Sequence, residues 1–125
     1  MKRAKGITGK LDDVFSRYKR LQAGGYCKRC WMMGKNKPIG YSWLANCHFH
    51  TRNKHSVRWD EDNTAALCSG CHRYIDDNPY KKIEFWLELL GEDKLAALDK
   101  RAENLKKVDK DALLVYYKAR LEEVE

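Results

Sequence analysis

Four cysteines occur as two CxxC pairs, and their type and spacing predict a metal site. The pairs are Cys27 with Cys30 and Cys68 with Cys71. Four thiolates satisfy the tetrahedral preference of Zn²⁺, and a two-residue gap lets one turn present both sulfurs of a pair. Since 37 residues separate Cys30 from Cys68, more than the roughly 15 to 20 of an ordinary zinc ribbon, the interval is expected to fold by itself. The sequence therefore predicts a structural zinc that staples the chain.

Two alternatives to this zinc site remain open. The pairs could be disulfide or redox pairs, but the chain begins without a signal sequence, and disulfides are typical of oxidising compartments. The other alternative has His48 or His50 replacing a cysteine as a zinc ligand. Cys47 is the fifth cysteine and belongs to neither pair.

The residues between and after the pairs predict hydrolysis of a phosphodiester, which needs a base for water and a cation for the charge on phosphate. His48 is the candidate base, because an unperturbed histidine has a pKa of about 6.5. His72 follows a zinc cysteine and is the candidate ligand of a catalytic divalent ion. His50 could join it, since alternate strand residues face one side. Asn63 is expected to fix the loop between a hairpin and a helix.

The composition favours a polyanionic partner. The chain has 125 residues, and 25 Lys and Arg against 18 Asp and Glu give a net charge of +7 and a pI of about 9.2. The predicted phosphate contacts are Lys28, Arg29, Arg52 and Arg58. No apolar run approaches the roughly 20 residues of a membrane span, so we expect a cytoplasmic protein, and its positive charge suits RNA as readily as DNA.

These residues must be positioned by a small α+β domain. Residues 1–10 are basic and predict a flexible arm. Residues 11–78 are expected to form the zinc-stapled core, whose N-terminal helix starts at Leu11 and stops before Gly24. Residues 79–125 predict helices packed on that core, within a single domain, and their apolar stripe is core or a dimer contact.

Within the core, two β-favouring segments predict a hairpin. The first runs from Tyr41 to Phe49 and the second contains Val57 and Trp59, on either side of a polar bend at 52–55. Asn63 is a good helix N-cap, so a helix from Thr64 is expected to carry Cys68, Cys71 and His72. In the last third, helices are expected from Pro79 to Gly91, then through Leu95, Leu98 and Leu105, and finally from Asp109 or Asp111.

The order of His48, Asn63 and His72 resembles the His-Asn-His (HNH) nucleases, which have a ββα-metal fold. A more specific resemblance is to the NinG (Rap) recombination endonucleases of lambda-type phages, and it covers about two thirds of the chain. It rests on Trp43, Cys47-His48-Phe49, the segments 58–63, 68–72 and 77–80, and Leu90-Gly91. The resemblance implies a treble-clef-like HNH core and a structure-selective endonuclease acting on branched recombination intermediates such as Holliday junctions and D-loops. Phage endonuclease VII resolvases are similar in plan.

The chain departs from these families at two positions. NinG-like proteins carry Gly in the place of Cys47 and Asn in the place of His72, and the resolvases carry Asp in the place of Cys47. The expected catalytic ion is Mg²⁺ or Mn²⁺, but a thiolate at Cys47 favours a softer ion if it binds.

The resemblance also implies a phage or prophage origin, and a homodimer is expected for cutting two strands of a junction. The alternatives are a nicking endonuclease for phage packaging or a mobile element, and a zinc module that binds nucleic acid without catalysis.

Overall fold

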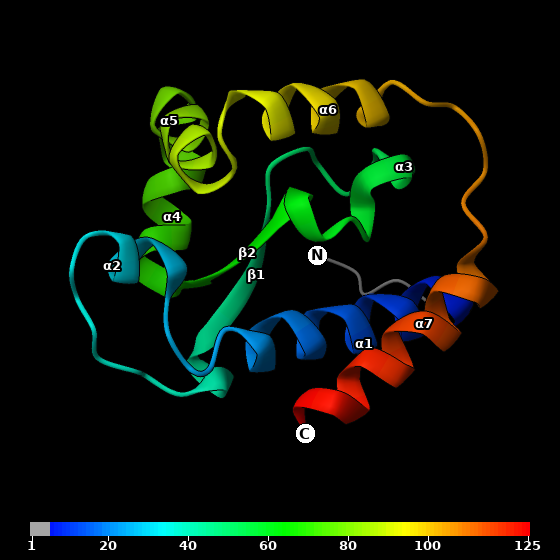
Figure 1. Cartoon of the computed structure of the whole chain (residues 1–125), viewed down its shortest axis with the longest axis horizontal. Helices are drawn as coiled ribbons and strands as arrows, with labels where there is room; N and C mark the ends of the chain where they lie inside the picture. Colours follow the sequence, from blue (N-terminus) through cyan, green and yellow to red (C-terminus); the bar gives the residue numbers. More distant parts are fainter. Residues whose placement is uncertain (1–5) are drawn as a thin grey trace.

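A computed structural model describes residues 6–125 and has an α+β architecture, with helices around a small sheet (Figure 1). The elements of the described residues are α1 (Gly6–Gln22), α2 (Lys28–Met32), the 3₁₀ turn η1 (Tyr41–Trp43), β1 (Leu44–His48), α3 (His55–Arg58), the 3₁₀ turn η2 (Glu61–Asn63), β2 (Thr64–Cys68), α4 (Ser69–Asp77), α5 (Pro79–Leu90), α6 (Glu92–Ala102) and α7 (Lys110–Val124). Over residues 6–125, no helix is long and apolar enough to cross a membrane.

The two strands form an antiparallel hairpin in which Leu44 pairs with Cys68 and His48 with Thr64. A hairpin was predicted, but the position of its second strand was wrong. The segment containing Val57 forms the single-turn helix α3, and β2 begins only at Thr64. Residues Thr64 to Leu67 are all buried, so β2 lacks the polar and apolar alternation that identifies a half-buried strand. Its alanines favour a helix in isolation, and tertiary burial overrides this preference.

The predicted role of Asn63 as a helix N-cap is consequently also wrong. Asn63 ends the 3₁₀ turn η2, and the residue that caps α4 is Cys68. The helix that carries Cys71 and His72 is therefore shorter than expected and starts at Ser69.

Helix α1 begins at Gly6 rather than Leu11, so the prediction of a flexible arm is wrong for residues 6–10. Residues 1–5 lie outside the described part of the chain. The helix extends because α7 supports it: the Lys110 ammonium donates to the Thr8 hydroxyl at 3.0 Å, and Gly9 is buried. Tertiary contacts thus outweigh the low helix propensity of the glycines.

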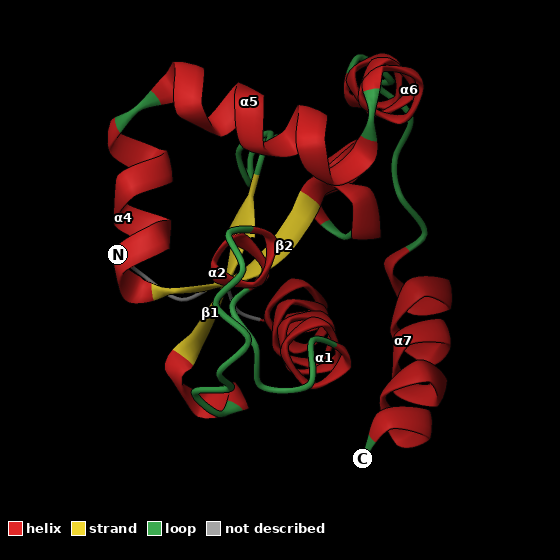
Figure 2. Cartoon of the chain, turned by 60° about the vertical axis from the view of Figure 1, so that its left-hand side comes forward, coloured by secondary structure: helices red, strands yellow, loops and turns green. Residues whose placement is uncertain are grey.

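Two hydrophobic clusters hold the fold together. The first joins the hairpin to α4, α5 and α6, and contains Leu67, Ile75 and Trp86, which are all fully buried. The second joins α1 to α7 through residues such as Phe15 and Tyr117, whose rings meet edge to face at 4.7 Å. The hairpin lies between α1 and α4 (Figure 2), so its two faces meet different helices.

The C-terminal third is helical, as predicted. Pro79 opens α5, and Gly91, with a φ of 85°, ends it. Asp109 caps α7 by accepting a hydrogen bond from the Ala112 amide at 3.0 Å. Leu105 does not extend the helical stripe of α6, because that helix ends at Ala102 and Leu105 is exposed in the following loop.

The helical tail also braces the segment before β2. The Tyr117 hydroxyl of α7 donates to the backbone oxygen of Trp59 at 2.6 Å. The Trp86 indole of α5 donates to the backbone oxygen of Asp62 at 2.9 Å. The tail therefore fixes the residues that lead into the second strand.

Candidate functional site

The four paired cysteines meet where α2 and α4 begin. In each pair the first sulfur accepts a hydrogen bond from the backbone amide of the second cysteine, at 3.5 Å for Cys27 and 3.4 Å for Cys68. All four sulfurs lie within 4.8 Å of one another, and those of Cys30 and Cys71 are 3.6 Å apart. Zn–S bonds of about 2.3 Å in a tetrahedron place sulfurs about 3.8 Å apart. The four free thiols therefore fit a structural zinc ion and are not joined as disulfides.

Arg29 belongs to this cluster and is not a free phosphate contact as predicted. Its guanidinium donates to the Cys71 sulfur at 3.4 Å and lies 4.3 Å from the centre of the Tyr74 ring. A positive charge in this position would balance the negative charge of a tetrathiolate site. Lys28 remains exposed on α2.

A second group of metal-ligand residues lies on the other side of α4. The ligand atoms of Cys47, His72 and Asp76 are all within 4.8 Å of one another. His72 Nε2 lies 3.0 Å from Asp76 Oδ2, because residues four apart are neighbours on a helix. Cys47 comes from β1, and its sulfur lies 4.0 Å from Asp76 Oδ1. Sequence reasoning had missed Asp76, although a His-x-x-x-Asp spacing directly after the second CxxC was the available signal.

Cys47 gives this second group an unusual donor set. Its side chain is buried, and burial raises the pKa of the thiol to about 12. A bound cation must displace the thiol proton, which a soft ion does more readily than Mg²⁺. Lys82 lies 3.3 Å from Asp76 Oδ1 and places a positive charge beside the group. One sulfur, one nitrogen and one carboxylate can hold a divalent ion and leave positions open for substrate.

His48 follows Cys47 on β1 and therefore faces the opposite side of the strand. Its Nε2 lies 3.0 Å from the backbone oxygen of Arg58, and a carbonyl can only accept, so this nitrogen carries the hydrogen. The neutral ring then has its lone pair on Nδ1. Burial lowers the pKa of His48, although the hydrogen bond to Arg58 works against this. At neutral pH the imidazole is uncharged and can accept a proton.

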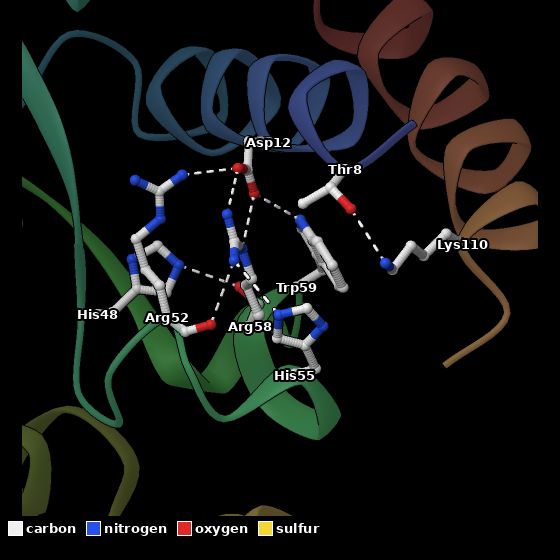
Figure 3. A network of polar contacts seen from close by, with 8 residues as sticks. All are labelled: Thr8, Asp12, His48, Arg52, His55, Arg58, Trp59 and Lys110. Carbon is white, nitrogen blue, oxygen red and sulfur yellow. Dashed lines mark hydrogen bonds and ion pairs between the residues drawn. The ribbon is translucent and has the colours of Figure 1, made fainter. Parts of the chain in front are cut away.

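The carbonyl that orients His48 is held in place by Asp12 of α1 (Figure 3). The Arg58 guanidinium donates to both carboxylate oxygens of Asp12, and the Trp59 indole donates to Asp12 Oδ1 at 2.9 Å. The predicted role of Arg58 as a phosphate contact is wrong, because this side chain is buried and paired. Arg52 also reaches Asp12, at 2.6 Å, but its side chain is 44% exposed.

Asn63 ties the residues after β1 to the start of β2. Its fully buried amide accepts a hydrogen bond from the His50 backbone N–H at 2.8 Å and donates to the His50 backbone oxygen at 3.1 Å. His50 was predicted to join His72 at the metal, but it is not part of the second metal-ligand group. β1 ends at His48, and the His50 ring pairs instead with Asp99 of α6 at 2.7 Å. Asn63 therefore fixes the backbone that follows His48.

A cleft of about 750 Å³ is lined by residues of α1, β1, the loop after β1, α4 and α5. It brings together His48, Arg52, His72, Asp76 and Lys82. Four of the predicted site residues are absent from the described residues that line this cleft: Lys28, Arg29, His50 and Arg58. The cleft thus combines the imidazole of His48 with His72 and Asp76 of the metal-ligand group and with two cationic side chains, Arg52 and Lys82.

Comparisons of the chain with family models, with curated proteins and with solved structures found no match. The chemistry of the cleft therefore rests on its own residues.

Proposed function

We propose that this protein is a metal-dependent endonuclease of the HNH, ββα-metal type. The observation that carries the proposal is the shared cleft, which is lined both by His48 and by two members of the metal-ligand group, His72 and Asp76. A base and a cation site on opposite sides of one phosphodiester are what hydrolysis requires. A zinc module that only binds nucleic acid needs neither.

In the proposed mechanism, His48 removes a proton from the attacking water. Its hydrogen bond to the Arg58 carbonyl keeps Nδ1 as the basic nitrogen and stabilises the imidazolium that forms. A divalent ion held by His72, Asp76 and Cys47 would supply Lewis-acid stabilisation of the charge on the phosphate and the leaving oxygen. Arg52 and Lys82 are the contacts that position the phosphate from within the cleft.

DNA is the proposed substrate, with branched recombination intermediates as its preferred form. The net charge of +7 supports a polyanion. The choice of branched DNA, and of products with 5′ phosphate and 3′ hydroxyl ends, comes from the resemblance to the NinG-like endonucleases. A homodimer would allow two opposed strands of a junction to be cut.

The test is cleavage of a fluorescent four-way junction and of a linear duplex with Mg²⁺ or Mn²⁺. We expect His48→Ala to lower the cleavage rate by about 10²- to 10⁴-fold, the usual contribution of a general base. His72→Ala should abolish metal-dependent cleavage while junction binding persists. His50→Gln is the matched control, since the His50 ring pairs with Asp99 and does not line the cleft.

The outcomes separate the alternatives. Cleavage that survives His48→Ala would remove His48 as the base. Junction binding without cleavage by the unaltered chain would support the non-catalytic zinc module. Equal cleavage of duplex and junction would support a nicking endonuclease instead.

A further inference from the structure

Trp43 is an exposed tryptophan, and packing within the described part of the chain does not explain why a tryptophan stands at this position. Its exposed fraction is 74%, whereas tryptophan is strongly buried on average. Trp59 and Trp86 follow that rule, with exposed fractions of 3% and 0%. Trp31, which is 44% exposed, at least packs edge to face on Tyr26. Within residues 6–125, no aromatic ring or guanidinium lies against the indole of Trp43.

The backbone that carries this indole is well anchored. Trp43 closes the 3₁₀ turn η1, in which its amide donates to the Gly40 carbonyl at 3.2 Å. The next residue, Leu44, is buried and pairs with Cys68 in the hairpin. The Tyr41 ring in the same turn lies under the Arg20 guanidinium, at 5.1 Å. When a ligand packs on the indole, little conformational entropy of the backbone would therefore be lost.

The indole lies beside the candidate metal centre. It lines a hollow of about 390 Å³ together with His72, Asp76 and Arg73. On its other side it lines a second hollow of about 330 Å³, with Ile39 and with Cys68 of the zinc cluster. A strand whose phosphate is held at His72 and Asp76 would therefore share this hollow with Trp43.

The ligand chemistry that fits a flat, exposed, anchored indole next to a phosphate site is a nucleobase. Bases stack on aromatic side chains through their faces, without regard to sequence. In a paired duplex both faces of each base are already covered by neighbouring bases, so only an unpaired or splayed base is available. Arg73 lines the same hollow beside the carboxylates of Asp76 and Asp77, and its guanidinium is the group there that suits the backbone of such a strand.

We propose that Trp43 is a stacking platform for an unpaired nucleobase next to the scissile phosphate, and that it makes the site selective for DNA with unpaired bases. This inference rests on the proposed function and specifies its substrate class. Selection for branches and forks would then arise in part from a single side chain in the first turn before β1.

The test measures binding by the His48→Ala chain, so that cleavage does not interfere, to two labelled DNA probes of equal length. One probe is a fork with unpaired arms and the other is a fully paired duplex. We expect Trp43→Ala to weaken fork binding by about tenfold, the usual effect of losing one stacked base, and to leave duplex binding unchanged. Trp43→Phe should retain most of the fork affinity. Tyr80→Ala is the control, because Tyr80 is 83% exposed but lines neither hollow.

A spectroscopic readout checks that the effect is direct. In a Trp31→Phe chain, Trp43 is the one exposed tryptophan left, since Trp59 and Trp86 are buried. Fork DNA should quench its fluorescence and duplex should not. Unchanged fork affinity in Trp43→Ala, equal losses for both probes, or absence of quenching would each overturn the proposal. Selective fork binding through Trp43 in a chain that cuts no DNA would support the stacking role and refute the proposed catalysis.

Discussion

The two metal-ligand groups share helix α4 but differ in composition and in access. The cluster of Cys27, Cys30, Cys68 and Cys71 has four identical sulfur ligands from two knuckles, which fit a tetrahedral zinc ion. The Cys47, His72 and Asp76 group has three different ligands and opens toward a large cleft. A closed shell can only hold the chain together, whereas an open shell leaves room for a substrate.

The closed group also serves the open one. Cys71 and His72 are adjacent on α4, so the zinc cluster fixes the first turn of the helix from which His72 and Asp76 project. The candidate base, His48, is held in a different way. Its ring contacts the Arg58 carbonyl, and the Arg58 side chain pairs with the Asp12 carboxylate of α1. The two ligand sets are therefore separate, although Cys71 of one and His72 of the other are adjacent in the sequence.

The largest loss of stability among these tests should come from removing one ligand of the four-cysteine cluster. A structural zinc contributes on the order of 10 kcal/mol, which is comparable to the whole stability of a small domain. We expect Cys71→Ser to lose both the zinc and the helical circular dichroism, while the unaltered chain carries one zinc in native mass spectrometry.

Cys47→Ser is the matched control, since it changes a cysteine of the open group. It should keep one zinc and the native helix content. If Cys71→Ser also kept its zinc and its fold, the division into a closed and an open group would be wrong.

The support of the open site by α1 can be broken with Asp12→Asn. The Asp12 carboxylate is the partner of the buried Arg58 guanidinium, so leaving this charge unpaired should cost about 3 kcal/mol of unfolding free energy. Asp93→Asn, an exposed change in the first turn of α6, should cost less than about 1 kcal/mol. Urea unfolding at pH 7 measures both.

The effect of Asp12→Asn should depend on pH. Burial alone would raise the pKa of Asp12, but the hydrogen bonds from Arg58 and Trp59 and the charges of Arg58 and Arg52 together outweigh burial and hold the pKa below its ordinary 3.8. A lowered pKa stabilises the fold above the unfolded value and stops doing so as pH falls through the folded value. The difference between the two chains should be constant from about pH 5 to 8 and shrink below about pH 4. A difference that grows in acid would contradict the ion pair.

The smallest expected effect concerns the sulfur of the open group. Replacing it by a hard oxygen in Cys47→Asp should raise cleavage with Mg²⁺ relative to Mn²⁺ by about tenfold. The zinc content should not change. Cleavage assays with each ion, and Cys47→Ser for comparison, measure the ratio. An unchanged ratio would mean that Cys47 lies outside the coordination shell.

The sequence determined the features that depend on local spacing. The CxxC pairs predicted the four-cysteine cluster, and Pro79, Gly91 and Asp109 marked ends of the C-terminal helices. Each of these signals spans only a few residues, so it can be recognised without knowledge of the fold.

Tertiary structure decided the features that depend on burial and on distant partners. The second strand was misplaced because Ala65 and Ala66 are buried on both faces and look helical in sequence. Arg58 was assigned to phosphate because its partner, Asp12, lies 46 residues away in sequence. In the open group, the spacing of Asp76 from His72 was a local signal, but Cys47 and Asp76 are 29 residues apart, and only the packing of α4 on the hairpin makes them neighbours.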